Sequence, residues 1–478
     1  MSSSISPTRV ASLVGDFSHA PAYAGLADAL IVVIGDGRIP IDTRLPSERE
    51  LTEALGVSRT TVTRAYAALR EAGYAESRRG SGTFTRVPGG RSRAHDRALL
   101  PRADAERTID LNCAAPSAPP GVAQAYSDAV AELPAYLGGH GYFPAGLPRL
   151  QQAIAATYVD RGLPTDPDQI MVTPGALSAA SIVAHSLTGP GDRALVESPV
   201  YPNATDALRR TGARLRPAPV DPDGWDLDAT TALLRQTAPR LAYLIPDFQN
   251  PTGHLMTDAE RERYAAALRL AHTVAVVDEA HQPLPLEGQS MPRPFAAHAH
   301  DAITIGSASK GFWGGLRIGW IRAPHALMER LTRTRVSMDL GAPVLEQLVL
   351  VRLLAGSEHL LEVNRARLRQ QRDALVAGVR DRLPDWRFRI PTGGLALWCQ
   401  LPEPLATAVA TEAEQHGVIV APGPVFAIEG GLDRFLRIPW TRPPDELAAA
   451  VEVLAKAWST VRSRPGRAAG TSPRVMVA

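Results

Sequence analysis

Residues 306–319 read GSASKGFWGGLRIG and contain Lys310, one of only two lysines in a chain of 478 residues with 51 lysines and arginines. Arginine replaces lysine almost everywhere else, and a guanidinium does not lose its proton to become a nucleophile as a lysine amine does. Ser307 and Ser309 offer hydroxyls beside this lysine, and Arg317 follows shortly after. An amine beside hydroxyls and a guanidinium suits a ligand with an aldehyde and a phosphate, such as pyridoxal phosphate. The alternative is a surface lysine in a glycine-rich loop.

Length and composition limit the classes of protein that this chain can be. A chain of this length predicts two or three domains, and 45% hydrophobic residues are typical of a soluble globular protein. No apolar run approaches the roughly 20 residues of a membrane helix, and the first residues lack the features of a signal peptide. With only Cys113 and Cys399, far apart, a reduced cytoplasmic protein is expected. The net charge of +2 means that any DNA contact must come from a local patch.

The N-terminal part of the chain carries the signals of a helix-turn-helix. Ser47 and Glu50 have the spacing of a capping box at the start of a helix over residues 48–55. After a glycine turn, Ser58 is placed to cap a second helix over residues 59–72, in which apolar residues recur at intervals of three and four. Two helices separated by a glycine turn of this length predict a helix-turn-helix.

A basic wing follows the second helix. Short strand-like runs over residues 74–77 and 82–85 flank a flexible basic tip, which predicts a winged helix. Between residues 58 and 86, six arginines stand against two acidic residues, a local balance of +4 that is enough to bind a phosphate backbone. The alternative is a winged helix that binds protein through a solvated charged face. Arginines and threonines on the exposed face of the second helix favour DNA.

This segment closely resembles the GntR class of winged-helix repressors. The matching stretches are LPSEREL at 45–51, GVSRTTV at 56–62 and RGSGTF at 79–84. The resemblance implies an operator-binding domain. Together with the exposed helix face and the basic tip, it marks these residues as DNA contacts: Arg49, Arg59, Thr60, Thr61, Arg64, Arg79 and Gly80.

Predicted strands and helices alternate in the rest of the chain. β-rich runs over residues 170–172, 241–245 and 274–277 are separated by helical segments, a pattern that predicts an α/β fold with a mostly parallel sheet. Ligands bind such sheets at the carboxyl ends of the strands, and the candidate site residues fall there. Gly175 ends one such strand and opens a helix, whose first amides can bind phosphate.

Three further side chains follow predicted strands. Tyr201 is placed to stack on a planar ring, although a buried core tyrosine is an equal interpretation. Asn250, in the stretch NPTG, can hydrogen-bond a phenolic oxygen, although a simple turn explains it as well. Asp278 ends an apolar strand and needs a partner, for which a protonated pyridine nitrogen is suitable. Each signal is modest alone, but the order of these residues, with Lys310 after them, resembles that in fold-type I pyridoxal-phosphate enzymes.

From about residue 110 to residue 458 the chain resembles class I and II aminotransferases. The stretches YFPAG at 142–146, APGPVF at 421–426 and FLRI at 435–438 match segments of that family. The resemblance implies that Lys310 forms the Schiff base, Asp278 pairs with the ring nitrogen, Asn250 bonds O3′ and Tyr201 stacks on the ring. It also implies that Gly175, Ala176, Ser307, Ser309 and Arg317 hold the phosphate, that Tyr142 reaches the phosphate of a partner subunit, and that Arg437 binds a substrate carboxylate.

One position departs from the aminotransferase pattern. These enzymes usually carry, three residues after the ring aspartate, a tyrosine that bonds O3′, and here that position is His281. A histidine can donate the same bond, but its ordinary pKa lies near neutral pH. The change leaves cofactor binding as expected and opens the question of transaminase competence.

A GntR-type winged helix joined by a linker to an aminotransferase-like domain is the architecture of MocR-type regulators, which the chain resembles over nearly its whole length. The expected fold is multidomain: a small α+β winged helix over residues 1–86, a linker over 87–108 and an α/β fold-type I domain over 109–462. That domain would contain a large mostly parallel sheet and a small C-terminal subdomain from about residue 330. Residues 463–478 have a composition typical of disorder.

The resemblance implies a transcription regulator that holds pyridoxal phosphate and senses an amine, an amino acid or a vitamin B6 ligand through the Lys310 aldimine. It also implies a homodimer that presents two winged helices to operator DNA, with no membrane and no metal site. The alternative is a pyridoxal-phosphate-dependent aminotransferase with an ancillary winged helix, because Asn250 and Arg437 complete a set of catalytic parts. The complete winged helix favours the regulator, and residual transaminase activity stays open.

Overall fold

The computed structural model describes residues 4–17, 21–35, 39, 43–78, 80–86, 108–221, 223–428 and 430–463. The chain divides into two compact units, one of residues 1–106 with 118–128 and one of residues 107–117 with 129–478. Within the described ranges, none of the helices combines the length and the apolar character needed to span a bilayer.

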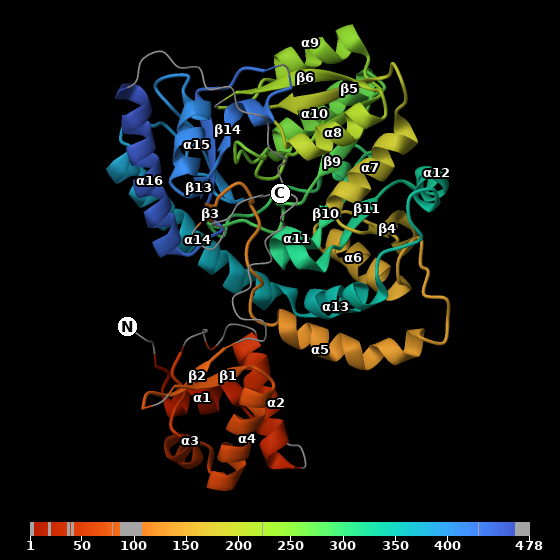
Figure 1. Ribbon diagram of the computed structural model, residues 1–478. Helices are drawn as coiled ribbons and strands as arrows, with labels where there is room; N and C mark the ends of the chain where they lie inside the picture. The colour runs from red at the N-terminus through yellow and green to blue at the C-terminus, as the bar shows by residue number, and fades with distance from the viewer. Residues whose placement is uncertain are drawn as a thin grey trace. The chain divides into compact units, whose positions relative to one another are not determined.

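The N-terminal unit contains a helix-turn-helix and a two-stranded wing (Figure 1). The predicted capping box is present: the Glu50 N–H donates to the Ser47 hydroxyl, and the Glu50 carboxylate accepts from the Ser47 N–H. Gly56 ends the first helix of the motif at a φ of 66°, in the left-handed region that favours glycine. The elements are α1 (Pro7–Val14), α2 (Ala22–Gly35), α3 (Glu48–Leu55), α4 (Arg59–Glu71), β1 (Ala75–Arg78) and β2 (Gly82–Thr85).

A small apolar core holds these helices together. Leu30, Leu51, Val62 and Leu69 are fully buried in one cluster, as the helical periodicity of the sequence predicts. Tyr66 of α4 is buried with them, and its hydroxyl donates to the backbone carbonyl just before α3. The core therefore fixes the angle at which α4 presents its polar face.

The large unit is built on an eight-stranded mixed sheet (Figure 1). Its strand order is β4-β11-β10-β9-β8-β5-β6-β7. Neighbours from β10 to β6 are parallel, β11 runs antiparallel between β10 and β4, and β7 is antiparallel to β6. The mostly parallel sheet predicted from the sequence is confirmed. The strands are β4 (Ile170–Thr173), β5 (Arg193–Ser198), β6 (Arg214–Asp221), β7 (Gly224–Trp225), β8 (Leu241–Leu244), β9 (Val274–Asp278), β10 (Ile303–Ser307) and β11 (Gly319–Arg322).

Helices between the strands cover this sheet and bury its aliphatic side chains. Helix α7 packs on β10 and β11, α9 on β6, and α10 on β9. The buried cluster combines residues of the strands with those of α7 and α8. The helices of this part are α6 (Pro148–Asp160), α7 (Ala176–Leu187), α8 (Pro202–Arg210), α9 (Leu227–Thr237), α10 (Asp258–Leu270), α11 (Ala308–Gly311) and α12 (His325–Val336). Helix α5 (Val122–Glu132) contains residues of both units.

The C-terminal part forms a second, smaller layer of helices on an antiparallel sheet. Strand β15 lies between β12 and β14, and α14 and α16 pack on each other. The short strand β3 (Ile109–Asp110), which follows residues 87–108 in the sequence, pairs with β13 (Val418–Ile419) in this part. The other elements are α13 (Val344–Ala355), α14 (Ser357–Arg382), β12 (Ala396–Gln400), α15 (Ala406–Gln415), β14 (Ala421–Pro422), β15 (Phe435–Pro439) and α16 (Pro444–Ser463).

Candidate functional site

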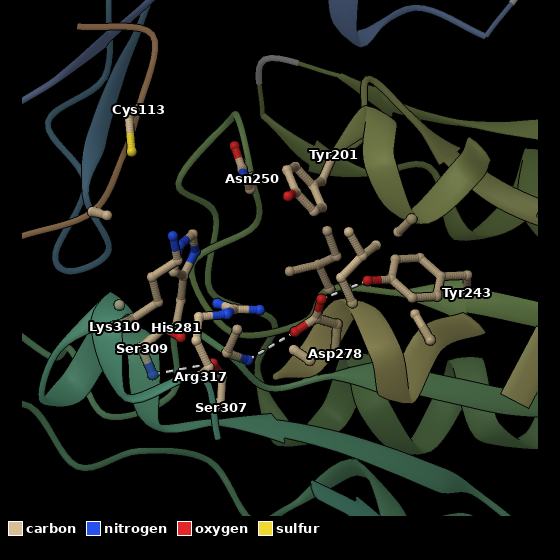
Figure 2. Close-up of a pocket in the computed structure, with 18 residues that line it drawn as sticks. Cys113, Tyr201, Tyr243, Asn250, Asp278, His281, Ser307, Ser309, Lys310 and Arg317 are labelled. Atoms are coloured by element: carbon tan, nitrogen blue, oxygen red, sulfur yellow. Dashed lines mark hydrogen bonds between the residues drawn. The ribbon is translucent and has the colours of Figure 1, made fainter. Parts of the chain in front are cut away.

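A cavity of about 480 Å³ lies at the carboxyl ends of the central strands of the large sheet. Figure 2 shows Tyr201 and Asn250 on one side of it and Ser307, Lys310 and Arg317 on the other. The segments that supply these side chains follow β5, β8 and β10. The parallel strand order therefore gathers residues that are far apart in the sequence. The predicted residues that line the cavity are Ala176, Tyr201, Asn250, Asp278, His281, Ser307, Ser309, Lys310 and Arg317.

Asp278 is the last residue of β9, and its carboxylate is held by two donors. The Tyr243 hydroxyl donates to Oδ2 at 2.5 Å, and the Ala280 N–H donates to Oδ1 at 2.8 Å. Burial raises the pKa of the Asp278 carboxyl, and these two hydrogen bonds oppose the rise. A buried carboxylate facing a cavity suits a cationic partner there.

The sequence prediction did not include Tyr243. This residue lies in the middle of β8, opposite Val276 of β9, and is almost fully buried. A tyrosine inside an otherwise aliphatic buried strand needs a partner for its hydroxyl, and that was the available signal. Cys113 also lines the cavity and was considered in the sequence only as a reduced thiol.

Lys310 lies in the short helix α11, directly after β10. Its Nζ donates to the backbone carbonyl of Ala114 at 2.8 Å. Burial lowers the pKa of Lys310 to about 8, and the positive charges of Arg437 and Arg317 act in the same direction, against Cys113 and Asp278. A much larger fraction of this amine is therefore in the nucleophilic, unprotonated form at neutral pH than for an ordinary lysine, although the protonated form still predominates.

Arg317 and the start of α7 form a tightly built cradle. Gly175 has a φ of 93°, and a Cβ there would lie 2.4 Å from an Arg317 guanidinium nitrogen. A Cβ on Gly319 would lie 2.5 Å from the backbone nitrogen of Ala176. Arg317 itself has a φ of 50°, a left-handed conformation that is strained for a side chain of this size. The two glycines thus let the Arg317 guanidinium lie against the N-terminus of the twelve-residue helix α7, an arrangement that favours the binding of an anion.

Ser307 and Ser309 lie on the same side of the cavity as Arg317 (Figure 2). Ser307 caps α11, and its hydroxyl oxygen accepts a hydrogen bond from the Ser309 N–H at 3.2 Å. Both side chains line the cavity. Two hydroxyls, a guanidinium and helix amides together can bind a phosphate group.

Asn250 and Tyr201 line the cavity on the side away from the serines. The Asn250 Oδ1 accepts from an Arg437 guanidinium N–H at 3.2 Å, so its amide NH₂ is the group left to donate into the cavity. The Tyr201 hydroxyl accepts from the side chain of Asn203 at 2.9 Å. Burial raises the pKa of Tyr201 to about 12, so this phenol stays neutral.

The structure places Arg437 behind the cavity wall. Its side chain is fully buried and is not among the residues that line the cavity. A second guanidinium N–H donates to the backbone carbonyl of Asn112 at 2.5 Å. Burial lowers the pKa of Arg437 to about 10, which leaves it charged at neutral pH. The Asn112 and Asn250 oxygens therefore already occupy this guanidinium, and a carboxylate that bound it would compete with them.

His281 lies against the cavity with one ring nitrogen engaged. Its Nδ1 lies 3.0 Å from the backbone carbonyl oxygen of Phe248, and the side chain is only 6% exposed. Tyr142, by contrast, is 57% exposed and does not line the cavity of its own chain.

In the N-terminal unit, the predicted DNA contacts differ in how they are held. Arg59 and Thr60 are exposed at the start of α4, and their side chains form no hydrogen bond or ion pair within the described residues. Arg64 instead lies over the ring of Tyr23 at 3.8 Å, and the Thr61 N–H is capped by the Ser58 hydroxyl. The first two side chains are therefore the ones presented most freely.

The remaining predicted contacts lie on α3 and on the wing. Arg49 forms an exposed ion pair with Glu53 at 3.3 Å, one turn further along α3. Gly80 has a φ of 73° at the tip between β1 and β2, and a Cβ there would meet no atom within 4 Å. Arg79 lies outside the described residues.

Comparison with known proteins identifies two families in the chain. Residues 118–454 match the family "Aminotransferase class I and II", and residues 22–85 match "Bacterial regulatory proteins, gntR family". The probable rhizopine catabolism regulatory protein MocR of Rhizobium meliloti is 31% identical over 77% of this chain and 78% of its own length. The 2-aminoadipate transaminase of Thermus thermophilus is 31% identical over 61% of this chain and 75% of its own.

Solved structures of aminotransferases share the fold of the large unit. LysN, the alpha-aminoadipate aminotransferase of Thermus thermophilus solved with N-(5'-phosphopyridoxyl)-L-leucine, matches with a TM-score of 0.70 and 28% identity, over 77% of this chain and 95% of its own. An archaeal alanine:glyoxylate aminotransferase matches with a TM-score of 0.69 and 26% identity, over 74% of this chain and 91% of its own.

Proposed function

The chain belongs to the class I and II aminotransferase family and joins it to a GntR-type DNA-binding domain, as MocR-type regulators do, and from this premise we propose that it is a pyridoxal-phosphate-dependent transcription regulator. Its large domain would sense an amine, an amino acid or a vitamin B6 ligand at the cavity around Lys310. The observation that carries this proposal is one cavity that combines a buried amine, a buried carboxylate and an anion cradle in a chain that also has a winged helix.

The residues around the cavity fit pyridoxal phosphate. The cradle of Arg317, Ser307, Ser309 and the first amides of α7 would hold the phosphate, and its construction leaves no room for a Cβ at Gly175. Asp278 would pair with the ring nitrogen, and Tyr201 would lie against the ring. When bound, the cofactor supplies an aldehyde for amines and a ring that withdraws electrons.

Lys310 is the residue that would tie ligand sensing to the cofactor. Its amine is the one that lines the cavity, and burial lowers its pKa towards neutrality. A ligand with a primary amine would compete with Lys310 for the cofactor. A ligand with a carboxylate as well would engage Arg437 in place of the Asn112 carbonyl.

On the DNA side, Arg59 and Thr60 of α4 would read the operator, and Gly80 would let the wing approach the backbone closely. Arg49, Thr61, Arg64 and Arg79 would add contacts to phosphates or bases. Tyr142, largely exposed in the single chain, suits a contact with the phosphate site of a partner subunit in a homodimer. Such a dimer would bind paired half-sites in operator DNA.

Transamination is the second candidate function. It is favoured by the retention of Asn250 and Arg437 in direct contact at the site, and the similarity to an aminotransferase extends over most of the large unit. The two functions require the same cofactor and differ in the event that ligand binding triggers: a change in DNA affinity or the release of a keto acid.

One experiment separates the two functions. Purified full-length protein, loaded with pyridoxal phosphate, is mixed with DNA from upstream of its own gene and with neighbouring intergenic fragments, and fluorescence anisotropy is measured with and without a panel of amino acids and amines. A regulator binds one fragment specifically, and at least one ligand changes that affinity. Steady conversion of an amino acid to its keto acid, without specific DNA binding, would instead identify an aminotransferase.

A further inference from the structure

Arg44 lies in an extended segment whose backbone is paired on both sides. It stands opposite Phe84 of β2 in an antiparallel bridge, and the N–H of the next residue, Leu45, donates to a β2 carbonyl at 2.9 Å. On the other side, the Ile5 N–H donates to the Arg44 carbonyl at 3.2 Å. Thr43 and Leu45 are buried and Arg44 is exposed, as the alternation of side chains along a strand requires. The paired backbone therefore directs the Arg44 side chain to the outer face of the wing, away from the core.

The Arg44 side chain runs along the wing towards its tip. A Cβ on Gly82 would lie 3.1 Å from the Arg44 Nε, and 3.7 and 3.8 Å from its Cγ and Cδ. Gly82 is the first residue of β2, so the tip that contains Gly80 comes directly before it. The absence of a side chain at Gly82 leaves room for the arginine stem, and the guanidinium therefore lies beside the base of the tip.

No carboxylate neutralises the charge of Arg44 among the residues that the structure describes, where its side chain forms no hydrogen bond or ion pair. Two other arginines of the wing, Arg78 and Arg86, are both paired with Glu76, at 2.7 and 3.4 Å. Arg78 also lies over the ring of Phe84, at 4.3 Å from its centre. Arg44 is thus an exposed cation of the wing whose donors are available to an anion.

The alternative role for Arg44 is to support the start of α3. The hydrogen bonds with Ser47 lower the pKa of the Glu50 carboxyl most, and the positive charge of Arg44 contributes less. The Glu50 carboxylate already accepts from the Ser47 N–H at 2.8 Å, and the capping box is complete without the arginine. A role in the capping box therefore leaves the donors of the guanidinium unused.

We propose that Arg44 is a further DNA-binding residue, which donates to a phosphate of the DNA backbone next to the wing tip. This inference rests on the proposed binding of operator DNA. A guanidinium presents its donors in a planar fork that matches two oxygens of one phosphate. Such a contact carries no sequence information and contributes to affinity through its charge. The segment before α3 thus joins α4 and the wing tip in the DNA-binding surface.

The test measures DNA affinity against salt concentration for the full-length parent, Arg44→Ala, Arg44→Gln and Arg44→Lys. The probes are the upstream DNA fragment of the experiment above and a duplex of the same length and composition in shuffled order. Loss of one phosphate contact lowers the steepness of log affinity against log salt by about 0.9. Arg44→Ala and Arg44→Gln should show this loss on both probes, with binding about tenfold weaker, the effect of one charged hydrogen bond. Arg44→Lys should keep most of the steepness because it keeps the charge.

Arg9→Ala removes an exposed cation from α1 of the same unit and is the matched control, with the steepness of the parent. If Arg44 only stabilised the wing, Arg44→Gln would lower the melting temperature or weaken binding without changing the salt dependence, and that result would overturn the inference. A loss confined to the upstream fragment would also overturn it, because it would mean that Arg44 reads bases. A parent protein that binds neither probe would overturn the proposed function instead.

Discussion

Loss of the Lys310 amine should remove the visible absorption band of the cofactor without unfolding the chain. In Lys310→Ala the visible absorption band of the loaded protein should disappear, because the only other lysine, Lys456, lies exposed on α16 away from the cavity. Lys456→Arg is the matched control and should keep the band. Borohydride reduction followed by peptide mass spectrometry should find the cofactor on Lys310, and label on Lys456 would contradict the assignment.

The pH dependence of this amine follows from its burial. Only the unprotonated amine attacks an aldehyde, and the pKa of Lys310 is lowered to about 8 by burial. Below that value the fraction of free amine falls about tenfold per pH unit, and above it the amine is fully available. The initial rate at which the visible band forms, measured between pH 6 and 10, should follow this curve. A midpoint near the ordinary lysine value would mean that Lys310 is solvated before the cofactor binds.

Single residues also mark the limit of what the sequence reveals about the site. Asp278, Asn250 and Lys310 were predictable because each follows a strand pattern whose carboxyl ends must meet. The role of Tyr243 was not predictable, because it depends on β8 lying beside β9 and the sequence of one strand does not determine its neighbours in the sheet. The burial of Arg437 beneath Asn112 likewise depends on packing between segments more than three hundred residues apart.

Among the elements, α4 is the one whose polar face should recognise DNA. Arg59→Ala should weaken operator binding by about 1–3 kcal/mol, the range for a charged contact to a base, and leave the cofactor band unchanged. Arg9→Ala, on the exposed face of α1, removes the same charge from the same unit and is the control. Anisotropy titrations at one fixed salt concentration measure the operator affinity of both variants. Equal affinities would mean that α4 is not the helix that recognises the operator.

Most elements were predictable because local signals and tertiary packing agree. The helix over 48–55 has its capping box, and α7 begins directly after Gly175, as expected. Helix α1 was not predicted, although Ser6 and Pro7 provide a cap and a first-turn proline. With eight residues it is too short for periodicity to stand out, and its place in the N-terminal core stabilises it.

At the scale of the whole molecule, the short segment over residues 112–114 supplies backbone carbonyls to two side chains of the site. Arg437 binds its Asn112 carbonyl and Lys310 binds its Ala114 carbonyl. The same segment follows β3 and, before it in the sequence, residues 87–108, which lead from the winged helix. The guanidinium that a carboxylate would engage and the amine that an aldehyde would engage are therefore both hydrogen-bonded to one stretch of backbone.

An occupant that engages both Arg437 and Lys310 would therefore compete with these two peptide carbonyls. Exchange of this kind is governed by thermodynamic reciprocity. If an effector changes operator affinity by some factor, operator DNA must change effector affinity by the same factor, and calorimetric titration of the effector into free and DNA-bound protein measures both sides of that equality. Unequal factors would mean that one of the two titrations had not reached equilibrium. The affinity of the protein for its effector would thus depend in part on the strength of the hydrogen bonds from Arg437 and Lys310 to the backbone of residues 112–114.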